Sequence, residues 1–228
     1  MRKITDVTGK GPIISQLTRI PGTTNMSGED TFWRWFIKNE QELFEFDSFD
    51  ISRRNMVFNR LAAELRKVHP ELVFEFGPTH SKREFVISAD GIKSAFPSVI
   101  GLLKAAPALT RWQFTAFRQR RSPISPVEID GRSVDPADVQ FSVVAGGRLI
   151  GIHLFIPDFR EGDTVLKQIG YLLLDDALGE YDVETQVGLI EILSPDTQTE
   201  EERFPLRDLP AMFDRLLSKS GARLGMPS

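Results

Sequence analysis

The sequence predicts an α+β protein in which a βαββαβ half of ferredoxin-like strand order precedes a ββαβα half, with mainly antiparallel sheet. Three observations predict it: apolar residues recur at helical spacing, short β-branched and aromatic runs lie between those segments, and Gly and Pro turn signals separate them. With 228 residues, 41% of them hydrophobic, the chain can bury one large core or two small ones.

Composition divides the chain into three parts. Residues 1–30 are rich in Thr, Gly and Pro, which predicts an extended arm. Residues 31–121 carry the βαββαβ pattern, and residues 122–228 carry a ββαβα unit that packs on it and ends in a frayed tail. The boundary lies near residue 122 because prolines interrupt all periodicity between residues 119 and 138. The pattern leaves open whether the two halves share one sheet.

The first half begins with aromatic residues on both faces of residues 31–37, which predict a strand covered on both sides. Ser52 as an N-cap, followed by Phe58, Leu61, Leu65 and Val68 at helical spacing, predicts a helix that His69-Pro70 terminates. A helix is therefore expected directly after the first strand.

The remaining elements of the first half follow a turn at Gly77-Pro78. Residues 72–76 and 85–88 flank this turn and predict an antiparallel pair. Apolar residues between positions 92 and 103 predict a second helix, in which Pro97 falls within the first turn. Residues 111–118 then predict the last strand of this half.

The second half opens with a predicted β-hairpin. Gly146-Gly147 lies between two strand-like runs, residues 139–145 and 149–156, and both glycines can adopt positive φ. With residue 145 opposite residue 148, one face is apolar and the reverse face is mixed. The apolar face carries Phe141, Val143, Ile150, Ile152 and Leu154, and the reverse face carries Gln140, Ser142 and His153.

After the hairpin, the pattern predicts two helices and a strand. Residues 165–177 form a helical stripe that Asp163 or Thr164 caps and Gly179 ends. Residues 187–193 predict a strand, and residues 209–217 predict a final amphipathic helix.

Composition also bounds the function. The formal net charge of -4 gives no global attraction to phosphate backbones, so nucleic-acid binding would need a local basic patch and is not favoured. The absence of cysteine excludes disulfides, thiolate metal sites and thiol nucleophiles. Because no signal-like or membrane-spanning apolar run is visible, we expect a cytoplasmic protein with no membrane partner.

An acidic group at the end of the third predicted helix could hold a hard divalent cation such as Mg²⁺ or Ca²⁺. It consists of Asp175, Asp176, Glu180, Asp182 and Glu184. Of these, Asp176, Glu180 and Asp182 are the candidate metal ligands. The alternative interpretation is a solvated acidic turn, and no cofactor is otherwise predicted.

His153 is the candidate catalytic residue, because a titratable ring on a mixed strand face could act as acid, base or ligand. The alternative is a hydrogen-bonded structural histidine. No phosphate-binding loop, nucleophile elbow or zinc helix accompanies it.

A strand rich in arginine and aromatic residues supplies the candidate binding residues Arg111, Trp112, Arg118 and Arg120. Such a surface can stack on bases or hold anions. Comparison with RNA-recognition domains fails at residues 81–88, which lack the glycine and flanking aromatics of their signature. The alternative is a core strand with solvated arginines.

Three segments resemble a family of bacterial proteins of unknown function. They are Trp33-Arg34-Trp35-Phe36, residues 82–91, and the run Ala105-Ala106-Pro107-Ala108-Leu109-Thr110-Arg111-Trp112-Gln113-Phe114 followed by Ala116-Phe117. Leu178-Gly179-Glu180 fits as well. The resemblance covers residues 31–193. It implies membership of that family and assigns no activity and no catalytic residue.

The leading hypothesis is a non-catalytic binding or regulatory module whose partner is another protein or a second copy of the chain. The absence of metal, nucleophile and phosphate motifs favours it. The alternative is a small hydrolase assisted by a divalent metal, with His153 as the proton carrier. A third hypothesis is binding of single-stranded nucleic acid through the Arg-aromatic strand.

Overall fold

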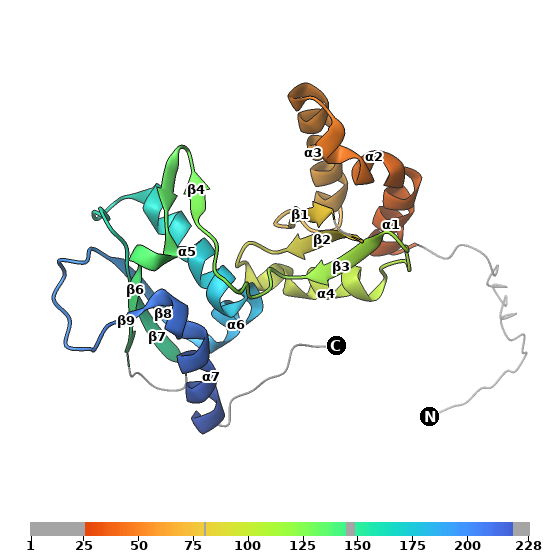
Figure 1. The fold of residues 1–228 in the computed structure, drawn as a ribbon. Helices are drawn as coiled ribbons and strands as arrows, with labels where there is room; N and C mark the ends of the chain where they lie inside the picture. Colours follow the sequence, from red (N-terminus) through yellow and green to blue (C-terminus); the bar gives the residue numbers. More distant parts are fainter. Residues whose placement is uncertain (1–25, 80, 145–148, 221–228) are drawn as a thin grey trace, which may run out of the picture.

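The computed structural model describes residues 26–79, 81–144 and 149–220. Most of the predicted arm, the Gly146-Gly147 turn and the predicted frayed tail from residue 221 onward lie outside these residues. The described chain forms two lobes, each with its own sheet (Figure 1). The α+β class predicted from the sequence is confirmed.

The first lobe packs helices against a three-stranded sheet of order β1-β2-β3. Its strands are β1 (Val73–Thr79), β2 (Arg83–Ser88) and β3 (Trp112–Ala116). Its helices are α1 (Gly28–Lys38), α2 (Glu40–Phe44), α3 (Ile51–Arg66) and α4 (Phe96–Lys104), with short 3-10 turns η1 (Phe46–Ser48) and η2 (Lys93–Ala95). β1 and β2 are antiparallel, as predicted, whereas β2 and β3 are parallel.

The predicted strand at residues 31–37 is wrong, because these residues lie in α1. The Ser27 side chain accepts a hydrogen bond from the Asp30 amide at 3.0 Å, which caps the helix. Phe32, Trp33 and Phe36 then form a buried helical stripe against the sheet. The described part of this lobe therefore has three α-helices before its first strand, and it does not adopt the βαββαβ order of a ferredoxin-like fold.

The other predicted elements of this lobe are present with local corrections. Asp50 rather than Ser52 caps α3, since its carboxylate accepts the Arg53 amide at 2.8 Å. Leu61 and Leu65 are buried as predicted, but Phe58 is 44% exposed and Val57 takes its place in the core. The observed stripe thus differs from the predicted one at its first position, where Val57 replaces Phe58.

The second lobe contains a four-stranded sheet of order β8-β7-β6-β9. Its strands are β6 (Gln140–Val144), β7 (Ile150–Phe155), β8 (Val187–Leu193) and β9 (Phe204–Pro205). Its helices are α5 (Thr164–Leu178), α6 (Glu180–Gln186) and α7 (Leu209–Ser220), with 3-10 turns η3 (Pro136–Asp138) and η4 (Leu206–Asp208). A separate hairpin of β4 (Val127–Ile129) and β5 (Arg132–Val134) lies in the proline-rich segment predicted to be irregular.

The register of β6 and β7 differs from the prediction by two residues. Phe141 pairs with Leu154 and Ser142 pairs with His153, where the prediction pairs them with Ile152 and Gly151. A shift by an even number of residues keeps each side chain on its face. The predicted division into an apolar face and a mixed face is therefore confirmed, although the predicted cross-strand partners are wrong.

Both lobes repeat one topology. In the first, the β1-β2 pair is followed by α4 and then by β3, parallel to β2; in the second, the β6-β7 pair is followed by α5 and α6 and then by β8, parallel to β7. Each larger sheet is therefore mixed, with a parallel pair at one edge, although most strand pairs among the described residues are antiparallel, as predicted. The last strand of each unit, β3 or β8, is an edge strand.

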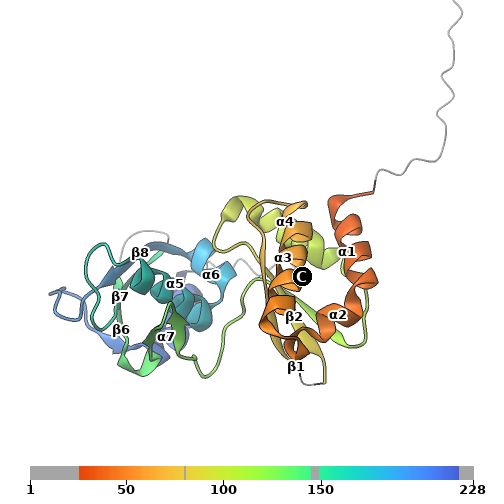
Figure 2. The ribbon, with the colours of Figure 1, turned by 90° about the horizontal axis from the view of Figure 1, so that it is seen from above.

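Each lobe has its own hydrophobic core. The buried residues of the first core all lie between Phe32 and Phe117. Those of the second core lie between Val134 and Leu217. The view in Figure 2 shows the lobes side by side, with α6 next to the first lobe. From α6, Tyr181 packs on the first core, where its ring lies 5.4 Å from that of Phe117.

Candidate functional site

Glu180, at the start of α6, connects the two lobes. Its side chain is fully buried, and one carboxylate oxygen accepts the Ala89 amide at 3.0 Å and the Gly91 amide at 3.4 Å. The other oxygen accepts the Arg118 amide at 3.1 Å. Gly179 makes this possible, because its positive φ of 83° lets the backbone turn from α5 into α6 against the 118–120 segment. Glu180 is therefore a structural anchor.

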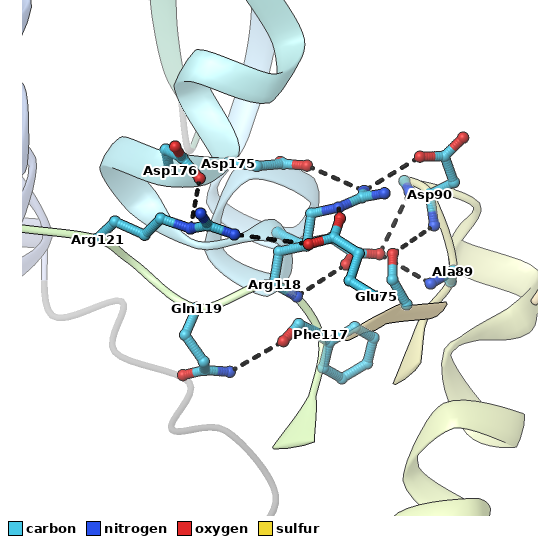
Figure 3. Close-up of polar contacts among 12 residues, drawn as sticks. Glu75, Ala89, Asp90, Phe117, Arg118, Gln119, Arg121, Asp175 and Asp176 are labelled. Atoms are coloured by element: carbon cyan, nitrogen blue, oxygen red, sulfur yellow. Dashed lines mark hydrogen bonds and ion pairs between the residues drawn. The ribbon is translucent and has the colours of Figure 1, made fainter. Parts of the chain in front are cut away.

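Arg118 lies at the centre of a polar interface between the lobes (Figure 3). Its side chain is 12% exposed and forms ion pairs with Glu75 at 2.5 Å, Asp90 at 3.1 Å and Asp175 at 3.4 Å. Glu75 and Asp90 come from the first lobe, and Asp175 comes from α5. The carboxylates around Arg118 thus outnumber it, and they raise the pKa of its guanidinium against the opposing effect of burial.

This crowding changes the protonation of Asp175. Burial raises the pKa of Asp175 to about 7, the attraction of Arg118 opposes the rise, and repulsion from Glu180 and Glu184 adds to it. Burial also raises the pKa of Glu184, with Lys93 opposing. The interface therefore holds a carboxyl group that titrates near neutral pH.

The predicted metal ligands lie in separate interactions. Asp176 pairs with Arg121 at 3.1 Å, and Asp182 pairs with Arg120 at 2.7 Å. Glu180 points to backbone amides instead, as described above. Among the described residues, no three His, Asp or Glu side chains are grouped so that they could hold a metal ion. The structure does not bring the predicted ligands together.

His153 lies on the outer face of the second sheet, as the alternation of side chains along the strand predicted. Its Nε2 is 3.0 Å from Glu191, and its Nδ1 is 3.8 Å from Glu201 and 3.5 Å from the Ser142 hydroxyl. Ser, His and Glu in contact have the composition of a hydrolytic triad, but Ser142 is fully buried in the middle of β6. A substrate cannot reach this hydroxyl, so the geometry favours the structural interpretation of His153.

The Arg-aromatic strand is β3, and its groups are used within the protein. Arg111 pairs with Glu40 at 2.5 Å, and the Trp112 indole donates to the same carboxylate at 2.6 Å. The Trp112 side chain is buried against α1 and α2. Arg118 belongs to the interface between the lobes, and Arg120 pairs with Asp182 and Asp214 of the second lobe. The structure places these residues in internal contacts rather than on a surface for bases.

An open strand edge in the second lobe is the feature that the sequence did not reveal. β8 pairs with β7 on one side, and in the described part of the chain no strand pairs with its other side. The Leu193 carbonyl accepts the Ile156 amide at 3.0 Å, so Leu193 points its backbone groups toward β7. Because successive residues of a strand point these groups to alternate sides, Ile190 and Ile192 direct theirs outward.

A groove runs along this open edge. It has a volume of about 560 Å³ and lies between β8 and the amino end of α5. One wall is formed by consecutive residues 190–194, and the other includes Gly162, Asp163, Thr164 and Lys167. Gly170 allows this arrangement, because α5 approaches β8 so closely that a Cβ there would lie 2.7 Å from the Ile192 side chain.

The groove was missed for a physical reason. The apolar run of residues 187–193 predicts a strand, but whether a strand is central or at an edge depends on pairing that a single sequence does not encode. Glu191 is the one charged residue in this run, and the low charge is the one sequence signal that its edge differs from most edge strands. Natural edge strands are more often protected by Lys, Pro or bulges.

In the part of the chain that the structure describes, no helix has both the length and the apolar character needed to cross a bilayer. Comparison of the chain with family models, with curated proteins and with solved structures gave no match.

Proposed function

We propose that this protein is a non-catalytic binding module that recognises an extended peptide segment of another protein by adding it as a strand to β8. The observation that carries the proposal is the open edge of β8 beside a groove of about 560 Å³. Strand addition to an exposed sheet edge is a recurrent mode of peptide recognition, in which main-chain hydrogen bonds supply affinity and flanking pockets supply specificity.

The main-chain groups of Ile190 and Ile192 offer two donors and two acceptors to such a peptide. Both residues line the groove, and the Ile192 side chain is only 8% exposed because it packs under α5. The edge is therefore fixed in position by the core, so little conformational entropy is lost when a peptide binds.

The charges around the groove favour a basic peptide. Glu161 is exposed in the loop before α5, and the Glu191 side chain, which also contacts His153, is 51% exposed on β8. Lys167 is the single cation among the groove residues, and Asp163 already pairs with Arg132 at 2.6 Å. Electrostatic complementarity thus selects Lys or Arg residues in the partner.

The substitution Ile190→Pro tests strand addition directly. Proline removes the outward amide of Ile190 but leaves the amides that bond to β7, and edge strands tolerate proline where the amide faces solvent. Peptides selected from a phage-displayed random library on the wild type should bind Ile190→Pro at least about tenfold more weakly. Fluorescence anisotropy with the selected peptides gives the affinities.

Ile190→Val is the matched control, because it keeps the amide and nearly the same shape, and it should bind like the wild type. In the wild type, peptide binding should also slow amide hydrogen exchange at Ile190 and Ile192. If the selected peptides bind both variants equally, or if library selection yields no binder, the strand-addition proposal fails. A β8-to-β8 dimer in analytical ultracentrifugation would instead identify a second copy of the chain as the occupant.

The other hypotheses stay predictions without a supporting arrangement of side chains. A metal-assisted hydrolase would need Asp176, Glu180 and Asp182 to converge, and each has a different partner. A nucleic-acid surface would need Arg111 and Trp112 to be available, and both contact Glu40. The cytoplasmic location and the resemblance to a bacterial family stay predictions as well.

A further inference from the structure

The second lobe contains a separate cavity of about 580 Å³, remote in sequence from the β8 groove. Four segments form it: the 120–124 segment, the turn η3, the end of α5, and the start of α7 with the residues before it. Its volume falls within the range of small-molecule sites in proteins.

The walls of this cavity are rigid. Four prolines line it, Pro123, Pro136, Pro205 and Pro210, together with the alanines at positions 137, 177 and 211. Proline and alanine have essentially no side-chain rotamer entropy to lose when a ligand binds. The cavity is therefore pre-organised, and its largely apolar walls suit a hydrophobic ligand body.

Its charged residues are mainly cationic. Arg120, Arg121 and Arg207 line the cavity, against the single carboxylate of Asp135, which accepts the Ala137 amide at 2.8 Å. The Arg120 guanidinium is occupied by Leu178, Asp182 and Asp214. The Arg207 side chain is 81% exposed with a pair of 4.0 Å to Asp208, and the Arg121 side chain is 54% exposed although its Nε pairs with Asp176 and its Nη2 with Glu75.

We propose that this cavity binds a small amphipathic anion, an apolar body carrying one carboxylate, sulfonate or phosphate group that Arg121 and Arg207 contact. The apolar walls take the body of the ligand, and the two guanidinium groups at the rim take its charge. This site goes beyond the proposed peptide-binding function and does not depend on it.

Occupancy of the site has a consequence for the interface between the lobes. Arg121 also pairs with Asp176 at 3.1 Å and with Glu75 of the first lobe at 3.5 Å. An anion bound to Arg121 therefore contacts a residue that already joins α5 to β1. Because a ligand that binds only the folded state stabilises it, binding should raise the melting temperature of the whole chain.

The probe for this site is 1-anilinonaphthalene-8-sulfonate, with the neutral N-phenyl-1-naphthylamine as its uncharged counterpart. We expect the folded full-length protein to bind one sulfonate probe per chain, as measured by fluorescence titration. Ala211 lies at an exposed position of α7 and lines the cavity, so Ala211→Trp should fill the cavity. We expect it to weaken the binding of both probes by about tenfold or more.

Arg207→Glu tests the charge. This side chain is exposed and makes no close ion pair in the described part of the chain, so the variant should fold normally. It should weaken the binding of the sulfonate probe by about fivefold or more and the binding of the neutral probe by less than about twofold. Arg160→Glu, an equal charge change at an exposed position outside the cavity, should leave both probes as in the wild type.

Three results would overturn the proposal: no saturable binding of the sulfonate probe to the wild type, probe binding that Ala211→Trp does not change, or an equal loss of affinity for both probes in Arg207→Glu. Circular dichroism on each variant establishes that it is folded. Ile190→Pro should bind the sulfonate probe normally, so failure of the β8 proposal and failure of this one are distinguishable.

Discussion

Glu180 is the residue on which the contact between the lobes most depends. Its two oxygens accept three backbone amides from two segments of the chain. In Glu180→Gln one acceptor oxygen is replaced by a donor that faces an amide, which leaves that buried donor unsatisfied. We expect the free energy of unfolding to fall by about 2 kcal/mol, measured by urea denaturation. Glu128→Gln, on the exposed side of β4, should change it by less than about 0.5 kcal/mol.

Asp175 makes stability depend on pH. Burial, opposed by Arg118, raises its pKa to about 7 from its ordinary value of 3.8, so between about pH 4 and pH 7 the folded state holds a proton that the unfolded state has lost. The contribution of Asp175 to the free energy of unfolding is therefore fully present at low pH and is lost as the pH rises through 7. Burial also raises the pKa of Asp176 and of Glu184, which acts in the same direction.

Asp175→Asn should remove this dependence, because the amide resembles the protonated carboxyl group. At pH 8 we expect the variant to be more stable than the wild type by about 2 kcal/mol, and at pH 4 the difference should be near zero. Urea denaturation at both pH values measures this. A variant less stable than the wild type at pH 8 would mean that the ion pair with Arg118 outweighs the cost of burying the charge.

The same residues show how far sequence reasoning reaches at this scale. The acidic group at residues 175–184 was identifiable from composition, and its unfavourable place near the end of α5 indicated that something offsets it. The partners that do so, Arg118, Arg121 and three backbone amides, come from distant parts of the chain. Only the fold brings them together, so the sequence suggested a metal where the structure has arginines.

At the scale of elements, the errors come from competing local signals. The segment at residues 31–37 combines strand-favouring aromatics with helical spacing and a Ser27 cap, and tertiary packing selects the helix. For α3, α4 and α5 the apolar period and the flanking Pro or Gly agree, and those helices were predicted correctly. Local sequence signals of neither kind indicate the open edge of β8, because an open edge depends on which strands are neighbours in the sheet.

The contact between α5 and β8 is set by Gly170. A Cβ at this position would lie 2.7 Å from Cδ1 of Ile192 and 3.0 Å from Cδ1 of Ile156. We expect Gly170→Ala to lower the free energy of unfolding by about 1 kcal/mol, because overpacking of the core outweighs the gain in helix propensity. Denaturant unfolding measures the change.

A double-mutant cycle locates the effect. Ile192→Val removes the Cδ1 that the new Cβ would meet, so Gly170→Ala should cost less in that background than in the wild type, by about 1 kcal/mol of coupling. Additive effects would show that the alanine is accommodated elsewhere. In that case the width of the groove beside β8 is not controlled at this position.

At the scale of the whole molecule, two hydrophobic cores are joined largely by polar contacts. Each core is built from its own segment of the chain, whereas Glu180 and the ion pairs of Arg118 and Arg121 occupy the region between them. Interfaces of this kind are more easily separated than a continuous core. Cooperative unfolding of the two lobes therefore depends on the polar network.

Arg118→Leu should uncouple the lobes. It leaves Glu75, Asp90 and Asp175 facing one another without their shared cation, and we expect a loss of about 3 kcal/mol from the interface. Scanning calorimetry should then resolve two thermal transitions, one for each core, where the wild type shows one. Arg132→Leu, which removes an exposed pair with Asp163 inside the second lobe, should keep a single transition. A single transition in Arg118→Leu would mean that apolar contacts such as that of Tyr181 with Phe117 suffice to couple the cores.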